Sequence, residues 1–151
     1  METFKKAFGV EVEEGEWTDI ELQYVKEFTS MFHSEQHIFA RSAEKKFEEI
    51  PPGTSLGRAF LKISGGLLIR AYVLREGDTI KDMMFTGTMQ MTPADALEKL
   101  EQELIGQKID EGIIKKKVHE MFESGTQIGM LEEPQLVDII LQACKFSYVE
   151  Q

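Results

Sequence analysis

The stretch SGGLLIRAYVLREGDTIKDMMFTGTMQMTPADALEKLEQELIG, residues 64–106, contains the elements around which the rest of the chain is expected to pack. Apolar side chains alternate along its first part. One side carries Leu67, Ile69, Ala71 and Val73, and the other carries Leu68, Tyr72 and Leu74 together with Arg70. Alternation with apolar residues on both sides predicts a strand that is buried on one face and largely covered on the other.

Two further strands are expected beside this one. Residues 76–78, Glu-Gly-Asp, predict a tight reversal because glycine tolerates a positive φ, and residues 79–86 then form the return strand. Residues 56–63 also alternate and are joined to the central strand by a glycine turn, so they are expected to be the first strand of the sheet. One side of that first strand is expected to contact water, because it carries Arg58, Phe60 and Lys62.

Helices are expected after the strands. Thr92 is a capping residue and Pro93 suits the first helical position, so a helix is predicted to start there and to end before Gly106. Its apolar side consists of Leu97, Leu100 and Leu104. Asp110 predicts the cap of a second helix and Pro134 the start of a third, strongly apolar one. Strands followed by helices predict an α+β domain, in which a three-stranded antiparallel sheet carries helices packed on one face.

The N-terminal part is expected to be helical. Thr18 and Glu21 have the spacing of a capping box, and aromatic residues follow at helical spacing up to Phe32, which predicts an amphipathic helix over residues 18–32. Its aromatic stripe is interpreted as core or as an interface. Residues 34–49 are a second possible helical stretch. The 151 residues are expected to form a single domain, with a helical N-terminal segment at 1–50 and a core at 54–151.

The amino-acid composition limits the partners and the cellular compartment that are expected for this protein. The net charge of −10 and the sequence pI of about 4.8 argue against nucleic acid as a partner and leave a basic protein surface as an electrostatic one. The single cysteine, Cys144, excludes an internal disulfide and fits a reducing compartment. No leader peptide and no apolar run long enough for a membrane span is recognised, so the protein is expected to be cytoplasmic.

The segments GGLLIRAYVLREGDTIKDMMFTG and TPADALEKLEQELIG resemble, in order and spacing, the accessory domain of lipoate–protein ligases. The similarity covers roughly residues 56–122. The chain departs from the family pattern after Gly87, where Thr88-Met89 stands in place of an Asp-Phe pair. The general fold of this accessory domain is thought to be shared with sulfur scaffolds of the SufE/NifU type.

The resemblance implies a stand-alone accessory subunit of a two-part lipoate–protein ligase. Such a subunit forms a heterodimer with a separate catalytic subunit and enables the ATP-dependent activation of lipoate to lipoyl-AMP, while lipoyl-domain proteins are reached only indirectly. It is expected to bind no cofactor by itself; ATP, Mg²⁺ and lipoate belong to the complex. The alternatives are a small sulfur or iron–sulfur scaffold, and a generic adaptor without lipoate chemistry.

The sequence patterns that could indicate catalysis or metal binding are incomplete, which favours a non-catalytic role. Ser64-Gly65-Gly66 lacks the context of a phosphate-binding loop and is interpreted as a hairpin turn. His33 and His37 would share one face of a helix, but a zinc site needs more ligands, so they are interpreted as exposed. Cys144 lies on an apolar helix side and is expected to be buried and unreactive. The run Lys115-Lys116-Lys117 is interpreted as a solvated helix face, with a contact to an acidic surface, or to a nucleotide's phosphates at the edge of a composite site, as the alternative.

We therefore predict no catalytic and no metal-binding residues, and a partner interface at Arg70, Lys81, Gly87 and Thr88. Sheet residues are held more rigidly than loop residues, which suits a subunit that shapes another protein's site. Arg70 is the most informative of the four because it interrupts an apolar side. An unpaired buried charge is costly, so its guanidinium is expected to reach either a carboxylate of this chain or a group on the partner.

Overall fold

The computed structural model describes residues 2–11, 14–63 and 65–145. The chain divides into two compact units, residues 1–40 and residues 41–151, which are treated separately below.

The first unit is helical. It contains α1 (Glu2–Phe8), α2 (Asp19–Phe32) and α3 (Glu35–Ile38). The capping box is confirmed: the Glu21 amide donates to Thr18 Oγ1 at 3.3 Å, and the Thr18 amide donates to Glu21 Oε2 at 2.8 Å. No residue of α2 is buried, and its aromatic stripe is continuous, with centroid distances of 6.1 Å from Tyr24 to Phe28 and from Phe28 to Phe32.

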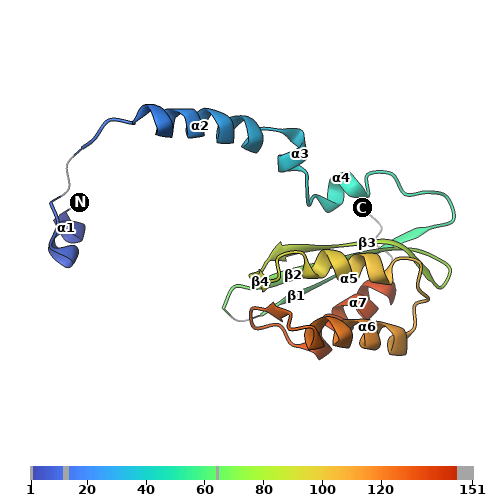
Figure 1. Ribbon diagram of the computed structural model, residues 1–151. Helices are drawn as coiled ribbons and strands as arrows, with labels where there is room; N and C mark the ends of the chain where they lie inside the picture. Colours follow the sequence, from blue (N-terminus) through green and yellow to red (C-terminus); the bar gives the residue numbers. More distant parts are fainter. Residues whose placement is uncertain (1, 12–13, 64, 146–151) are drawn as a thin grey trace. The chain divides into compact units, whose positions relative to one another are not determined.

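The second unit contains the three-stranded antiparallel sheet that the sequence predicts (Figure 1). Its strands are β1 (Ser55–Lys62), β2 (Leu68–Glu76) and β3 (Thr79–Thr88), in the order β1-β2-β3. The register places Phe60 of β1 and Thr86 of β3 on either side of Arg70 in β2. A second sheet of two short strands, β4 (Met91–Thr92) and β5 (Gln127–Ile128), is not predicted by the sequence pattern.

Three helices cover one face of the large sheet (Figure 1). They are α5 (Ala96–Leu104), α6 (Glu111–Glu123) and α7 (Glu133–Lys145). α7 packs on β1 and β2, α5 packs on β3, and α6 packs on both of the other helices. Between sheet and helices lies one hydrophobic core, whose largest fully buried members include Phe85, Ile69, Ile80, Met83, Leu97, Leu100, Leu104 and Ile140. The α+β fold with helices on one face is confirmed.

The helix predicted to start at Thr92 begins later, so that prediction is wrong. Thr92 belongs to β4, where it pairs with Gln127. Residues 93–95 then form a turn in which the Pro93 carbonyl accepts the Ala96 amide at 3.2 Å, and α5 starts at Ala96. Tertiary pairing thus places Thr92 in a strand and keeps it from capping the helix. The predicted cap at Asp110 is confirmed, because its carboxylate accepts the Ile113 amide at 3.0 Å, and α7 starts at Glu133, one residue before Pro134.

Within residues 41–145, the described cover on the other face of the sheet lies around Tyr72. The short helix α4 (Ala43–Lys46) and the residue after it bring Ala43 and Phe47 onto this face. There they form a smaller cluster with Tyr72, Leu74, Met84 and Leu56. The Phe47 and Tyr72 rings stack with centroids 6.3 Å apart. The half toward Phe60 is not covered in this way: Phe60 is 67% exposed, which confirms the expected contact of this side with water.

Among the described residues, none of the helices has both the length and the apolar character that a membrane span requires.

The end of β3 depends on glycine at position 87. Gly87 has a φ of 147°, a conformation that residues with side chains rarely adopt, and a Cβ built there would overlap the Leu68 carbonyl of the neighbouring strand. We therefore expect Gly87→Ala to lower the free energy of unfolding by more than about 1 kcal/mol, measured by urea denaturation. Gly53→Ala is the matched control, because Gly53 also has a positive φ (81°) but no atom within 4 Å of such a Cβ. Equal losses in both variants would contradict a close strand approach at Gly87.

Candidate functional site

An ion pair between the buried Glu101 and the partly exposed Arg41 holds the outer edge of β3. The Glu101 side chain is 4% exposed, and Arg41 approaches it with both terminal nitrogens, at 2.6 Å (Nη2–Oε1) and 3.2 Å (Nη1–Oε2). The two residues also satisfy the backbone of Phe85: its amide donates to Glu101 Oε1 at 2.6 Å, and its carbonyl accepts from Arg41 Nη2 at 2.7 Å. Together they take the place of a neighbouring strand at this point.

Sequence reasoning missed this pair. Arg41 lies in a charged stretch with no pattern that marks it. Glu101 did have a signal, because it stands four residues after Leu97 and three before Leu104, on the apolar side of the helix. A carboxylate in that position must be paired when it is buried, which predicts a cationic partner without identifying it.

The backbone groups along the rest of the β3 edge have hydrogen-bond partners as well. Near its start, the Ile80 amide donates to the Gln107 carbonyl at 3.0 Å, and the Gly106 amide donates to the Ile80 carbonyl at 2.7 Å. In the middle, Lys46 Nζ donates to the Met83 carbonyl at 2.9 Å and contacts Asp82 at 2.7 Å. The chain's own groups therefore cap β3 from Ile80 to Phe85.

Removing one partner of the ion pair should be costly. Arg41→Ala leaves the Glu101 carboxylate buried with the Phe85 amide as its remaining described donor, and we expect a loss of about 1–3 kcal/mol in the free energy of unfolding, measured by urea denaturation. Arg41 and Glu101 contact each other and both bind the Phe85 backbone. The double variant with Glu101→Ala should therefore lose less free energy of unfolding than the sum of the two single losses. Lys45→Ala, which removes only an exposed pair with Glu48, is the control. Additive losses would contradict a coupled network.

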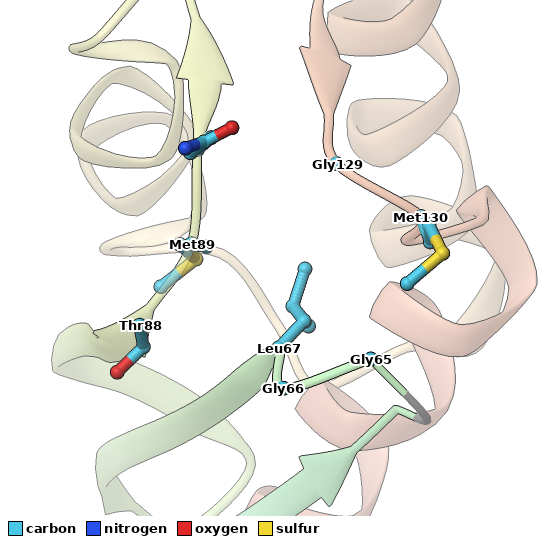
Figure 2. A pocket seen from close by; sticks show the side chains of 8 residues that line it. Gly65, Gly66, Leu67, Thr88, Met89, Gly129 and Met130 are labelled. Carbon is cyan, nitrogen blue, oxygen red and sulfur yellow. The ribbon is translucent and has the colours of Figure 1, made fainter. Parts of the chain in front are cut away.

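A pocket of about 390 Å³ opens beyond the capped part of β3 (Figure 2). Three chain segments form it: the turn between β1 and β2, the segment that leaves β3, and the loop after β5. Its lining residues are Gly65, Gly66, Leu67, Thr88, Met89, Gln90, Gly129 and Met130. Figure 2 shows Leu67 between the segment with Met89 and the segment with Met130. Glycine backbone and flexible methionines make this an adaptable apolar site.

A second pocket of about 280 Å³ lies on the other side of the segment that leaves β3. It is lined by Arg41, Phe85, Thr86, Gly87, Met89, Met91, Ala94, Leu97 and Glu98. Met89 lines both pockets, so the segment after Gly87 is bordered by a hollow on each side. Among the described residues that line the first pocket, none has a charged side chain, and Thr88 supplies the hydroxyl group.

The structure brings three of the four predicted interface residues together. Arg70 and Thr88 lie on the same side of neighbouring strands, because Thr86 is opposite Arg70 and Thr88 is two residues further on. Gly87 and Thr88 each line one of the two pockets. Lys81 lies near the other end of β3, where its Nζ contacts Glu76 at 3.0 Å. The interface role of these residues stays a prediction.

Arg70 is half-buried and stands directly opposite the exposed Phe60. Its side chain forms neither a hydrogen bond nor an ion pair with another residue in the part of the chain that the structure describes. A guanidinium in that position has five donors available to a partner molecule.

The other candidates from the sequence are held by ordinary contacts. His33 ends α2 whereas His37 lies in α3, so the two imidazoles do not share a helix, and within the described residues no group of His, Cys, Asp or Glu is arranged to hold a metal. His119 Nδ1 lies 3.2 Å from Glu133, and this hydrogen bond raises the pKa of His119. The lysine run is paired throughout, at Lys115–Glu111, Lys116–Glu120, and Lys117 with Glu103 and Glu120.

Cys144 is buried on the core side of α7, as the sequence predicts. Burial raises the pKa of its thiol to about 11, because desolvation disfavours the thiolate. The thiolate is the reactive form, so Cys144 is a poor nucleophile and a poor metal ligand in the folded protein.

The raised pKa gives a direct prediction for thiol labelling. At pH 8 only about one thiol in a thousand is ionised when the pKa is about 11, against about one in ten at the ordinary value of 9.0. We expect iodoacetamide to label native Cys144 at least about 100-fold more slowly than the same chain in urea, followed by mass spectrometry. Labelling of the native protein at the rate of a free peptide thiol would contradict this environment.

These features define a small α+β domain. The chain matches no protein-family model and no curated protein. Among solved structures, it is similar to a chain from an archaeal lipoylation system, a bi-partite lipoate protein ligase and its E2 lipoyl domain from Thermoplasma acidophilum. The identity is 22% and the TM-score 0.52, over 58% of this chain and 96% of that chain. At this identity the similarity establishes the fold.

Proposed function

We propose that this chain is a non-catalytic accessory subunit of a two-part lipoate–protein ligase. It binds a separate catalytic subunit as a heterodimer and enables the ATP-dependent activation of lipoate to lipoyl-AMP for protein lipoylation. The observation that carries the proposal is the fold: the match spans 96% of a chain from a bi-partite lipoate ligase system. The resemblance of GGLLIRAYVLREG and TPADALEKLEQELIG to the accessory domain of such ligases is an independent support.

The properties of the candidate site fit a supporting role. Binding a nucleoside triphosphate with Mg²⁺ calls for cationic side chains or a glycine-rich helix start for the phosphates, and for carboxylates or hydroxyls for the metal. The first pocket has no charged side chain in its described lining, and its glycines belong to a hairpin turn and a loop. The residues present therefore do not fit ATP, so in the proposed complex ATP, Mg²⁺ and lipoate are held by the catalytic subunit.

The alternative of a sulfur or iron–sulfur scaffold is not favoured. Such a protein needs exposed thiols of low pKa, whereas Cys144 is buried and the pKa of its thiol is raised to about 11. A generic adaptor would use the same surface without any link to lipoate, and the experiment below distinguishes it.

The proposal predicts activation only in the mixture of both chains. The purified chain with ATP, Mg²⁺ and lipoate should form no lipoyl-AMP. Added to a ligase catalytic chain from the same genome that lacks an accessory domain, it should raise the rate of lipoyl-AMP formation at least about tenfold, because correct positioning of a site is worth several kcal/mol.

The readout is release of pyrophosphate together with mass-spectrometric detection of lipoyl-AMP, and the catalytic chain alone is the control. Lipoyl-AMP formed by this chain alone would contradict a non-catalytic role. Equal rates with and without this chain would leave the generic adaptor as the better account.

A further inference from the structure

The uncovered half of the open sheet face has a distinctive chemistry. We call it the cationic face and define it by Phe60 and Lys62 of β1 and Arg70 of β2, with Leu68, Thr86 and Thr88 beside them. None of these six residues is acidic. An exposed aromatic ring next to two cations is a combination that favours binding of another protein.

The two cations of this face have no ion-pair partner among the described residues. The protein has a net charge of −10, and most of the cations in residues 41–145 are paired with carboxylates, as in Arg41–Glu101 and Lys46–Asp82. Lys62 and Arg70 form no ion pair with any described residue, although carboxylates are abundant elsewhere. Their charges are thus available to an incoming group, and an acidic group is repelled by most of the remaining surface.

The edge of β1 is available in the same place. β1 has eight residues and is an edge strand of the sheet. The Ile63 amide donates to the Leu67 carbonyl at 2.9 Å, which continues the ladder between β1 and β2 through the odd-numbered residues. By the alternation of an antiparallel ladder, the amides and carbonyls of Phe60 and Lys62 point away from β2.

The two edges of the sheet differ in whether their outward-facing backbone groups have hydrogen-bond partners. The backbone of β3 is capped by Gln107, Lys46, Glu101 and Arg41, whereas no comparable cap on Phe60 or Lys62 is found within the described residues. A long open edge with an exposed aromatic residue is the kind of template to which another chain adds a strand.

We propose that the cationic face and the β1 edge are the docking site for an extended acidic segment of the catalytic subunit. This inference rests on the proposed function. The segment pairs with the β1 backbone at Phe60 and Lys62, places a carboxylate opposite Lys62 within reach of Arg70, and covers the Phe60 ring with an apolar side chain. Cross-strand pairs of opposite charge and of apolar residues stabilise such an added strand.

The first test measures affinity for the catalytic chain. We expect the double variant Lys62→Glu/Arg70→Glu to bind about tenfold or more weakly than the wild type at low salt in calorimetric titrations, with a smaller difference at high salt. Phe60→Ser should also weaken binding, but independently of salt. The matched control is Lys108→Glu/Lys145→Glu, which makes the same change of charge at two exposed lysines away from this face and should bind within about twofold of the wild type. A cooperative thermal transition in each variant shows that it is folded.

The second test measures whether a strand of the catalytic chain pairs with the β1 edge. Amide hydrogen exchange by NMR should show the Phe60 and Lys62 amides exchanging fast in the free chain and at least about tenfold more slowly in the complex, while the Ala59 and Leu61 amides are already protected in the free chain.

The outcomes separate the two proposals. If the wild type does not bind the catalytic chain, the proposed function fails, and this inference fails with it. If the wild type binds and activates while the patch variants bind equally well, the inference alone is overturned, and the charges at this edge serve to prevent self-association. Weaker binding of the variants without protection of the Phe60 and Lys62 amides would overturn the strand addition.

Discussion

The architecture of the second unit depends on how the edge of β3 is satisfied. A strand at the edge of a sheet exposes amides and carbonyls that must find partners, and here Glu101 and Arg41 bind both groups of Phe85. Glu101 lies in α5, so the same carboxylate ties the helix to the sheet. Arg41 lies at the start of the unit and precedes the short helix that covers part of the open sheet face.

This arrangement explains why the two halves of the open face differ. With Arg41 fixed at Phe85, the following residues place Ala43 and Phe47 over Tyr72. Beyond that cover remain Phe60 and Arg70, together with the two pockets beside the segment that leaves β3. The exposed part of this face is therefore the part that the described elements of residues 41–145 leave uncovered.

Apolar and cationic groups dominate the described part of that surface. Glycines and methionines form most of the described lining of its first pocket, and the thiol of Cys144 is buried with a pKa raised to about 11. The fold is shared with a chain of an archaeal bi-partite lipoate protein ligase system, at 22% identity.

The sequence by itself determined the elements whose causes are local. Alternation around Ala71, the turn at Gly77 and the caps at Thr18 and Asp110 involve residues only a few positions apart, and all appear as predicted. Only the tertiary structure decided features that join distant segments. Thr92 pairs with Gln127, which delays α5, and Glu101 binds Arg41 across the sheet edge. A local pattern shows that Glu101 needs a partner, but which group reaches it depends on how the whole chain folds.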